Sequence, residues 1–348
     1  MELPHEPDSA LRTQHRLPRQ LLRGQQDHRP RLPHHQQPGP LMSRNTLGLT
    51  VIVPCYNTGN FVREAVESTL RQRLSFRGEV VVIDDGSDDP DTLASLDACS
   101  ALPEVRVVRL GENQGAQAAR NAGLDAAQYP YVLPLDSDDR LADDTTLLAT
   151  GSYPERAVRL LESEPDLAFV HTYSQMFGTF QGLTISAYPC REELLVRKHH
   201  APMSIVYRRA DALAAGGYDP RIRKWQDWSF AIDLLAARHR RGHPNTIACI
   251  PGPFHEYRVH ARFARLSVAQ VDELQAVRLT VEKNLDYFQT ILADNRPAAE
   301  LAGFVCASKP DRLTDLLHMA AVDLDQALTL ARGRKATLGS PINVLGIP

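Results

Sequence analysis

Strand-like and helix-like segments alternate through the first half of this 348-residue chain, and this alternation constrains its fold more than any other feature. Apolar, β-branched runs of strand length are separated by helical spacing, as in NFVREAVESTLRQ, where Val62, Val66 and Leu70 share one face. The predicted strands are LGLTVIVP, EVVVIDDGS, VRVVRL and YVLPLDSDD, of which the second ends in acids and glycine and the fourth in acids. Such alternation is typical of a mostly parallel sheet with helices on both faces, so the sequence predicts an α/β fold.

The second half of the chain is less regular. Beyond Ser267 the spacing is helical, so we expect a C-terminal helical extension. The N-terminal segment is rich in Pro, His, Gln and Arg and has too little apolar surface to offset the entropy of ordering. The predicted strands here are LAFVHTY, SIVYR and NTIACI, and the predicted helices are PERAVRLLESE, WSFAIDLLAARHRR, VDELQAVRLTVEKNLDYF and DRLTDLLHMAAVDLDQALTLA. The predicted domains are a disordered tail at residues 1–45, an α/β domain at 46–265, a helical extension at 266–335 and a loose tail at 336–348.

Composition argues against several classes of protein. A formal net charge of −3 is unlike that of a dedicated nucleic-acid-binding protein, which usually carries a basic excess. Five cysteines without CxxC spacing argue against a structural zinc site or a disulfide framework, and they fit a reducing cytosol. The sequence contains no run of about 18 apolar residues, which a transmembrane helix needs, and the N-terminus lacks the apolar segment of a secretory signal.

Polar side chains follow three of the predicted strands. They are Pro54-Cys55-Tyr56-Asn57 after the first, Asp84-Asp85-Gly86-Ser87 after the second and Asp136-Ser137-Asp138-Asp139 after the fourth. Ligands of parallel α/β sheets bind beyond the carboxyl ends of the strands, so these clusters mark a candidate site. Asp and Gly also form turns at strand ends, and for the second cluster alone the two interpretations are equally good.

The third cluster is harder to explain as a turn. Asp136, Asp138 and Asp139 place three carboxylates within four residues, so one of them is expected to hold a proton unless a cation lies between them. Mg²⁺ or Mn²⁺ supplies such a charge, and it commonly binds one or two carboxylates together with substrate phosphates and water. The spacing therefore predicts a divalent metal site.

Four motifs together resemble a known family. TVIVPCYN, VIDDGSDD, N-x-G-x-x-x-A-R-N-A-G and LDSDD, in this order, are similar to an inverting family 2 glycosyltransferase of the GT-A fold, over residues 48 to 265. The resemblance implies a Rossmann-like sheet. It also implies transfer of a sugar from a nucleotide-sugar donor, with a UDP-sugar favoured, to an acceptor hydroxyl with inversion.

The resemblance assigns a nucleotide-binding role to the first two motifs. Pro54, Tyr56 and Asn57 would line the base and the ribose. Asp85 would accept a hydrogen bond from the base, for which a carboxylate opposite an imide N–H is well suited.

The third and fourth motifs carry the phosphate and metal roles. Asn113, Gly115 and Arg120 belong to the third, where the guanidinium of Arg120 would face the nucleotide or its diphosphate. The alternative for Arg120 is a structural salt bridge to the acidic strand ends. Asp136 and Asp138 form the DxD motif, whose acids would hold Mn²⁺ or Mg²⁺ and touch the ribose, and Asp139 is the third acid of this cluster.

A downstream stretch, MSIVYRRADALAAGGYDPRIRKWQDWSFAIDLL, resembles the acceptor-side segment of the same family. Gln226-Asp227 stands where the family has a Glu-Asp pair, so Asp227 is the candidate general base and the role of Gln226 is open. The alternative for Asp227 is a plain helix N-cap.

HEYRVHARFARLS resembles the closing Tyr-Arg-x-His element of the family. In this element His260 would approach the metal or the diphosphate; the alternative is a surface histidine.

The mechanism implied is a single displacement that needs no protein nucleophile. The metal neutralises charge on the leaving diphosphate, and Asp227 takes the proton of the acceptor hydroxyl. The acceptor would be a glycan or a lipid-linked sugar, as in polysaccharide biosynthesis, and no nucleic acid is involved. We expect a cytoplasmic protein that can contact the inner face of the membrane and can form a homo-oligomer.

Several rival functions share parts of this pattern. A nucleotide-sugar pyrophosphorylase carries a Gly-rich, Arg-containing loop where this chain has PCYNTGN, and a nicotinamide dehydrogenase carries GxGxxG there. A haloacid-dehalogenase-type phosphatase has its DxD on the first strand, whereas here the motif follows the fourth. The rival of a different class is a non-catalytic glycosyltransferase-like domain that binds a nucleotide sugar or a glycan.

Overall fold

The computed structural model describes residues 47–179, 181–184, 190–197, 204–259 and 272–308, together with five single positions between 320 and 328. The predicted tails at residues 1–45 and 336–348, most of the last predicted helix and His260 lie outside the described residues.

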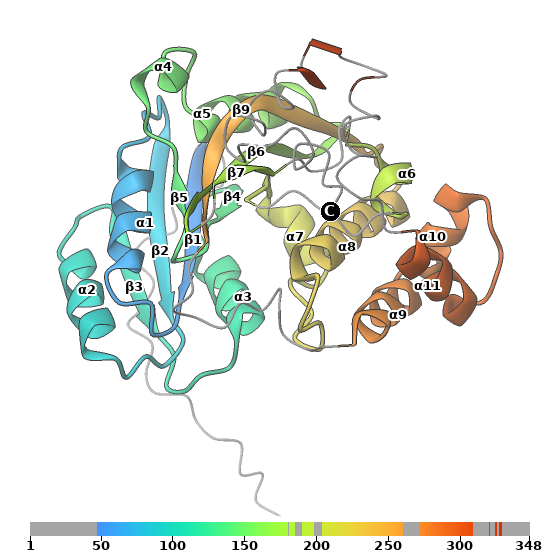
Figure 1. The fold of residues 1–348 in the computed structure, drawn as a ribbon, viewed down its shortest axis with the longest axis horizontal. Coiled ribbons are helices and arrows are strands. Elements are labelled where there is room, and N and C mark those ends of the chain that lie inside the picture. The colour runs from blue at the N-terminus through green and yellow to red at the C-terminus, as the bar shows by residue number, and fades with distance from the viewer. Residues whose placement is uncertain are drawn as a thin grey trace, which may run out of the picture. The chain divides into compact units, whose positions relative to one another are not determined.

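The described residues form one nine-stranded sheet of order β3-β2-β1-β4-β8-β6-β9-β5, with β7 paired to β6 (Figure 1). The strands are β1 (Gly48–Cys55), β2 (Arg77–Asp84), β3 (Val105–Arg109), β4 (Tyr131–Pro134), β5 (Arg140–Leu141), β6 (Leu167–Gly178), β7 (Gly182–Thr184), β8 (Val206–Arg208) and β9 (Thr246–Val259). Strands β1 to β4 are parallel, as predicted, and so are β6 and β9. The sheet is mixed, because β8 runs antiparallel to β4 and β6, β5 to β9, and β7 to β6.

Helices cover both faces of this sheet, as the alternation of elements predicts. They are α1 (Phe61–Leu70), α2 (Pro90–Ser100), α3 (Ala116–Ala126), α4 (Thr145–Leu148), α5 (Tyr153–Ser163), α6 (Glu192–Leu195), α7 (Arg209–Ala214), α8 (Gln226–Arg240), α9 (Glu273–Lys283), α10 (Leu285–Leu292) and α11 (Ala298–Ala307). Successive residues of β1 point to opposite faces. Ile52 packs in the cluster that contains Ala119 of α3, and Val51 and Val53 pack in the cluster that contains Val62 of α1.

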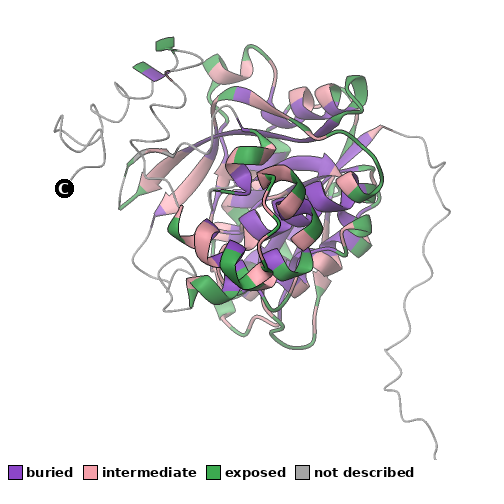
Figure 2. Cartoon of the chain, turned by 90° about the vertical axis from the view of Figure 1, so that its right-hand side faces the viewer, coloured by how far each residue is buried: buried purple, intermediate pink, exposed green. Residues whose placement is uncertain are grey.

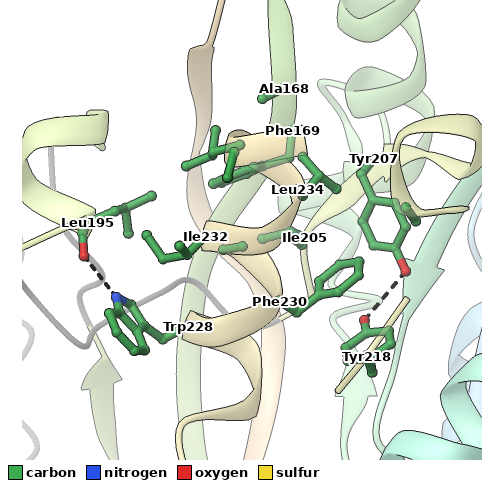
Figure 3. Close-up of a cluster of buried hydrophobic side chains, with 14 of the residues drawn as sticks. Ala168, Phe169, Leu195, Ile205, Tyr207, Tyr218, Trp228, Phe230, Ile232 and Leu234 are labelled. Atoms are coloured by element: carbon green, nitrogen blue, oxygen red, sulfur yellow. Dashed lines mark hydrogen bonds between the residues drawn. The ribbon is translucent and has the colours of Figure 1, made fainter. Parts of the chain in front are cut away.

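Helix α8 is the centre of the larger core cluster. Trp228, Phe230, Ile232 and Leu234 are all buried, and the indole N–H of Trp228 donates to the carbonyl of Leu195 at 2.8 Å (Figure 3). The C-terminal helices contribute to this same cluster, with Val277, Val281, Tyr287, Phe288, Leu301, Ala302 and Val305. Figure 2 views the molecule from the side of these helices, where exposed and half-buried residues lie in front of the buried residues of the core. Among the described residues, no helix has the length and apolarity that crossing a membrane requires.

One predicted helix is two helices. The stretch VDELQAVRLTVEKNLDYF breaks at Asn284, which separates α9 from α10. The Asn284 side chain is buried, and its amide donates to Asp233 at 2.6 Å and to the carbonyl of Thr280 at 3.1 Å. Asn competes with helical backbone through such bonds, and the gain of a buried partner on α8 explains the break.

Gly123 lets α3 approach β1 closely, and this contact provides a stability test. A Cβ at Gly123 would lie 2.3 Å from Cγ2 of Ile52. We therefore expect Gly123→Ala to lower the free energy of unfolding by about 1–3 kcal/mol, as overpacking commonly does. Gly303→Ala in α11 is the control, because nothing lies within 4 Å of its added Cβ and Ala favours a helix. Urea denaturation compares the two, and equal stabilities would contradict the close contact.

Candidate active site

The three predicted clusters lie at one edge of the sheet. β1 pairs in parallel with β2 on one side and with β4 on the other, and Cys55 is in register with Asp84. The carboxyl ends of these strands are therefore adjacent, as the sequence predicts. We call residues Asp136–Asp139, between β4 and β5, the acidic turn.

Asn57 joins the first cluster to the second. Its backbone is left-handed, at φ 52°, and its N–H donates to Ser87 Oγ at 3.1 Å. Its side-chain N–H donates to Asp88 at 2.7 Å, and its side-chain oxygen Oδ1 accepts the backbone N–H groups of Asp88 and Asp89. Of the other two residues predicted here, Pro54 is buried in β1, whereas Tyr56 is 45% exposed. Tyr56 is thus the large side chain that this loop presents to solvent.

Asp85 is bonded to the third motif. One carboxylate oxygen accepts the N–H of Gln114 and the other the N–H of Gly115, both at 2.8 Å, and Asp85 is 2% exposed. Gly115 begins α3 with φ 94°, and it also donates to Oδ1 of the exposed Asn113 at 3.1 Å. Asp85 therefore shapes the loop before α3, and a base N–H would have to use its remaining lone pairs.

Arg120 bridges two parts of the candidate site. From α3 its guanidinium donates to Asp136 at 2.5 Å and to the side-chain carbonyl of Gln226 at 2.9 Å, and it lies 5.4 Å from the ring centroid of Tyr218. Arg120 is only 6% exposed. The salt bridge to an acidic strand end, which the sequence left open as the alternative, is therefore present. The structure places Arg120 between the acidic turn and the start of α8.

Asn121, which sequence reasoning did not single out, reinforces this bridge. Its side chain accepts the N–H of Tyr218 at 2.7 Å and donates to the carbonyl of Tyr218 at 2.8 Å. The third motif thus joins the segment around Tyr218 and Gln226 to the first half of the chain through consecutive residues of one helix.

Asp227 lies in the first turn of α8 and is half-buried. The N-cap position belongs to Trp225, at φ 62°, and no side chain caps this helix end, so the plain N-cap explanation does not apply to Asp227. Burial raises the pKa of Asp227 above its ordinary value; the charge of Arg120 opposes this shift and that of Asp136 adds to it. A carboxylate with a raised pKa is the kind of group that serves as a general base.

The carboxylates of the acidic turn lie in different environments. The side chain of Asp136 is 43% exposed and that of Asp138 is half-buried, whereas Asp139 is 2% exposed. Asp139 accepts the backbone N–H of Arg258 at 2.7 Å and lies 3.2 Å from Nε2 of His255. Burial raises the pKa of Asp139 to about 7, with His255 opposing the shift.

Protein groups relieve part of the repulsion within the acidic turn, because Arg120 pairs with Asp136 while a backbone N–H donates to Asp139, which also lies beside His255. The raised pKa of Asp139, to which Asp136 and Asp138 contribute, agrees with the expectation that one carboxyl of this cluster tends to hold a proton. No group of three or more His, Cys, Asp or Glu residues in the described part of the chain could hold a metal ion. Asp136 and Asp138 still fit Mg²⁺ or Mn²⁺, which needs only one or two carboxylates when phosphate oxygens complete its shell.

His255 and Arg258 are site residues that sequence reasoning missed. Both lie on β9, and His255 is fully buried, with its Nδ1 at 2.7 Å from Ser174 Oγ of β6. The signal was near at hand, since both precede His260 in the segment HEYRVHARFARLS.

Comparisons with known proteins agree with this geometry. Residues 50–182 match the model of the family described as glycosyl transferase family 2. An uncharacterized glycosyltransferase of Haemophilus influenzae is 27% identical over 194 residues, which cover 54% of this chain and 62% of the relative. The succinoglycan biosynthesis protein ExoO of Rhizobium meliloti is 40% identical over 96 residues, 28% of this chain and 27% of the relative. The matches thus span less than two thirds of either relative. Over residues 50–182, the part that contains the three clusters, the chain is thus similar to glycosyl transferase family 2.

A solved structure shows the same fold. Residues 1–349 of TarS from S. aureus, in complex with UDP-GlcNAc, align with a TM-score of 0.56 at 20% identity, over 84% of this chain and 93% of that one. The likeness establishes the GT-A fold that the motifs imply.

Proposed function

We propose that this chain is a glycosyltransferase that moves a sugar from a nucleotide-sugar donor, with a UDP-sugar favoured, to an acceptor hydroxyl with inversion. The observation that carries the proposal is the Arg120 bridge, which joins Asp136 of the acidic turn to Gln226, the residue that precedes Asp227 at the start of α8. The match of residues 50–182 to glycosyl transferase family 2 supports glycosyl transfer, and TarS, which shares the fold, was solved with UDP-GlcNAc.

The loops after β1 and β2 and before α3 would bind the nucleotide. The exposed ring of Tyr56 is available to stack on a base, and Asn57 and Asp85 hold the loops in place around it. In this proposal the nucleotide-side residues are Pro54, Tyr56, Asn57, Asp85, Asn113, Gly115, Arg120 and Asp136.

Asp136 and Asp138 would hold a divalent metal, Mn²⁺ or Mg²⁺, with His260 as a further predicted ligand outside the described residues. When bound, the metal would supply positive charge to the leaving diphosphate, a contribution of several kcal/mol in such sites. The ion pair with Arg120 holds Asp136 at this edge of the sheet.

Asp227 would act as the general base. It would accept the proton of the acceptor hydroxyl while that oxygen attacks the anomeric carbon and the bond to the diphosphate breaks. One displacement inverts the anomeric configuration, so no protein nucleophile is needed. Cys55, which stands beside the first motif, is unsuited to that role because burial raises the pKa of its thiol to about 11.

A glycan or a lipid-linked sugar is the acceptor class that we propose. ExoO is named for the biosynthesis of succinoglycan, which supports a role in polysaccharide biosynthesis. The proposal extends to the whole chain, although the matches cover only part of it.

A donor panel tests the proposal. Purified protein is mixed with UDP-, dTDP- or GDP-sugars in Mn²⁺, Mg²⁺ or EDTA, and release of the nucleoside diphosphate and binding of each donor are followed. We expect one nucleotide class to bind and to be released in a metal-dependent manner. Binding without release, even with candidate glycan acceptors present, would favour the non-catalytic glycosyltransferase-like domain. Failure to bind any donor would overturn both functions.

A further inference from the structure

The main chain of the acidic turn is held by one arginine of β9. Arg258 donates its backbone N–H to Oδ1 of Asp139 at 2.7 Å, and its Nε donates to the backbone carbonyl of Asp138, also at 2.7 Å. These two bonds join residues about 120 positions apart in the sequence. They fix both the peptide that follows Asp138 and the side chain of its neighbour.

The guanidinium of Arg258 is itself held in place. Its carbon lies 4.2 Å from the ring centroid of Phe61 in α1 and 4.5 Å from that of Phe177 in β6. Its terminal nitrogen donates to Glu64 of α1 at 2.5 Å, and the side chain is 12% exposed. A guanidinium that stacks on two rings and bonds a carboxylate has few accessible rotamers, so it presents Nε to the turn in one orientation.

We propose that Arg258 is a positioning residue that fixes the acidic turn, so that the carboxylates of Asp136 and Asp138, which would hold the metal, are presented to the donor side in one geometry. This inference rests on the proposed function. Arg258 acts through the turn and not on the donor, because its bonds go to the main chain of Asp138 and to the buried Asp139. Reacting groups must be held within a fraction of an ångström, and a misplacement near 1 Å costs about 10²-fold in rate.

Arg140 offers a matched control. It lies over the same ring of Phe177, at 4.2 Å, and is 3.6 Å from the same Glu64, with Glu256 as a further partner at 2.9 Å. The side chain of Arg140 thus shares the anchors of Arg258, but its bonds go to those anchors and not to the turn. Glu64 also keeps one arginine when the other is replaced.

The experiment compares Arg258→Met with Arg140→Met in the full chain. Three quantities are measured: hydrogen–deuterium exchange of the amides in residues 135–141, the KM and kcat for the donor, and the Tm. For Arg258→Met we expect exchange in this segment to be about tenfold faster, and kcat/KM to fall about 10²-fold. For Arg140→Met we expect exchange and kcat/KM to stay near the wild-type values. The Tm should fall by a similar amount in the two methionine variants. Arg258→Lys keeps the positive charge but lacks the planar guanidinium, so it should recover part of the lost kcat/KM and exchange protection. It also replaces Arg258→Met in the comparison if the methionine variant does not fold.

Two outcomes overturn the inference while the proposed function stands. The first is a wild-type protein that transfers sugar while both methionine variants lose activity and exchange protection equally, which means that the anchors alone matter. The second is faster exchange in Arg258→Met with unchanged kinetics, which means that the order of the turn does not serve the reaction. A wild-type protein that neither binds nor turns over any donor overturns the proposed function, and this inference falls with it.

Discussion

Asp227→Asn is expected to lower kcat by about 10²- to 10⁴-fold, the usual contribution of a positioned general base, and to leave donor binding nearly unchanged. The substitution keeps the shape of the side chain but removes its basicity. Asp227 lies at the start of α8, across Arg120 from the acidic turn, so the loss is confined to the acceptor side. Initial rates at saturating donor, together with donor affinity from calorimetry, separate the two effects. A variant with kcat within a few-fold of wild type would place the base elsewhere.

The pH dependence of kcat gives an independent test of Asp227 as the general base. The base must be ionised to accept a proton, so kcat should fall as the pH drops through the pKa of Asp227. Because burial raises that pKa, the acidic limb should lie above the ordinary range of an aspartate, and it should be absent from Asp227→Asn. Gln226→Glu adds a second carboxylate next to Asp227, at the guanidinium of Arg120. Because like charges raise each other's pKa, the acidic limb should move to still higher pH. A limb at the pH of an ordinary aspartate would contradict this assignment.

The first half of the fold could be predicted because each strand ends where its apolar run ends. The long strand β9 could not. NTIACI was predicted as a strand, but β9 continues through Pro251, Gly252 and Pro253, which usually argue against a strand interior. The structure accommodates them with a register shift between Thr172 and Ser174 of β6, where the Thr172 hydroxyl donates to the carbonyls of Ile250 and Gly252.

The continuation of β9 explains why part of the candidate site was missed. It carries His255 and Arg258 to the acidic turn, although 119 positions separate Arg258 from Asp139. The sequence shows three clustered acids but not the distant cations and amides that satisfy them, so a metal seemed necessary on charge alone. Only the three-dimensional structure shows that Arg120, His255 and Arg258 already meet part of that need.

The motif positions were predicted correctly as an edge of the sheet, but the sequence did not predict which bonds these side chains make within the protein. Asn57 and Asp85 were expected to contact the nucleotide, and both make several bonds within the protein. Motif residues can serve a site by building its loops, and single residues in a sequence do not distinguish that role from direct contact. For the same reason the direct contacts to the donor stay predictions.

Asp138→Asn is expected to lower transfer by about 10³-fold or more, because a metal that neutralises the leaving diphosphate contributes several kcal/mol. Asp136 shares its charge with Arg120, and Asp139 is buried against β9, so metal binding at the turn depends strongly on Asp138. The substitution removes the charge of the side chain and keeps the backbone carbonyl of residue 138, to which Arg258 donates. Asp143→Asn is the control, because it loses one exposed ion pair, with Arg71. Rates are measured against Mn²⁺ concentration and in EDTA, and an Asp138→Asn enzyme as fast as wild type in both would show that transfer needs no metal at this turn.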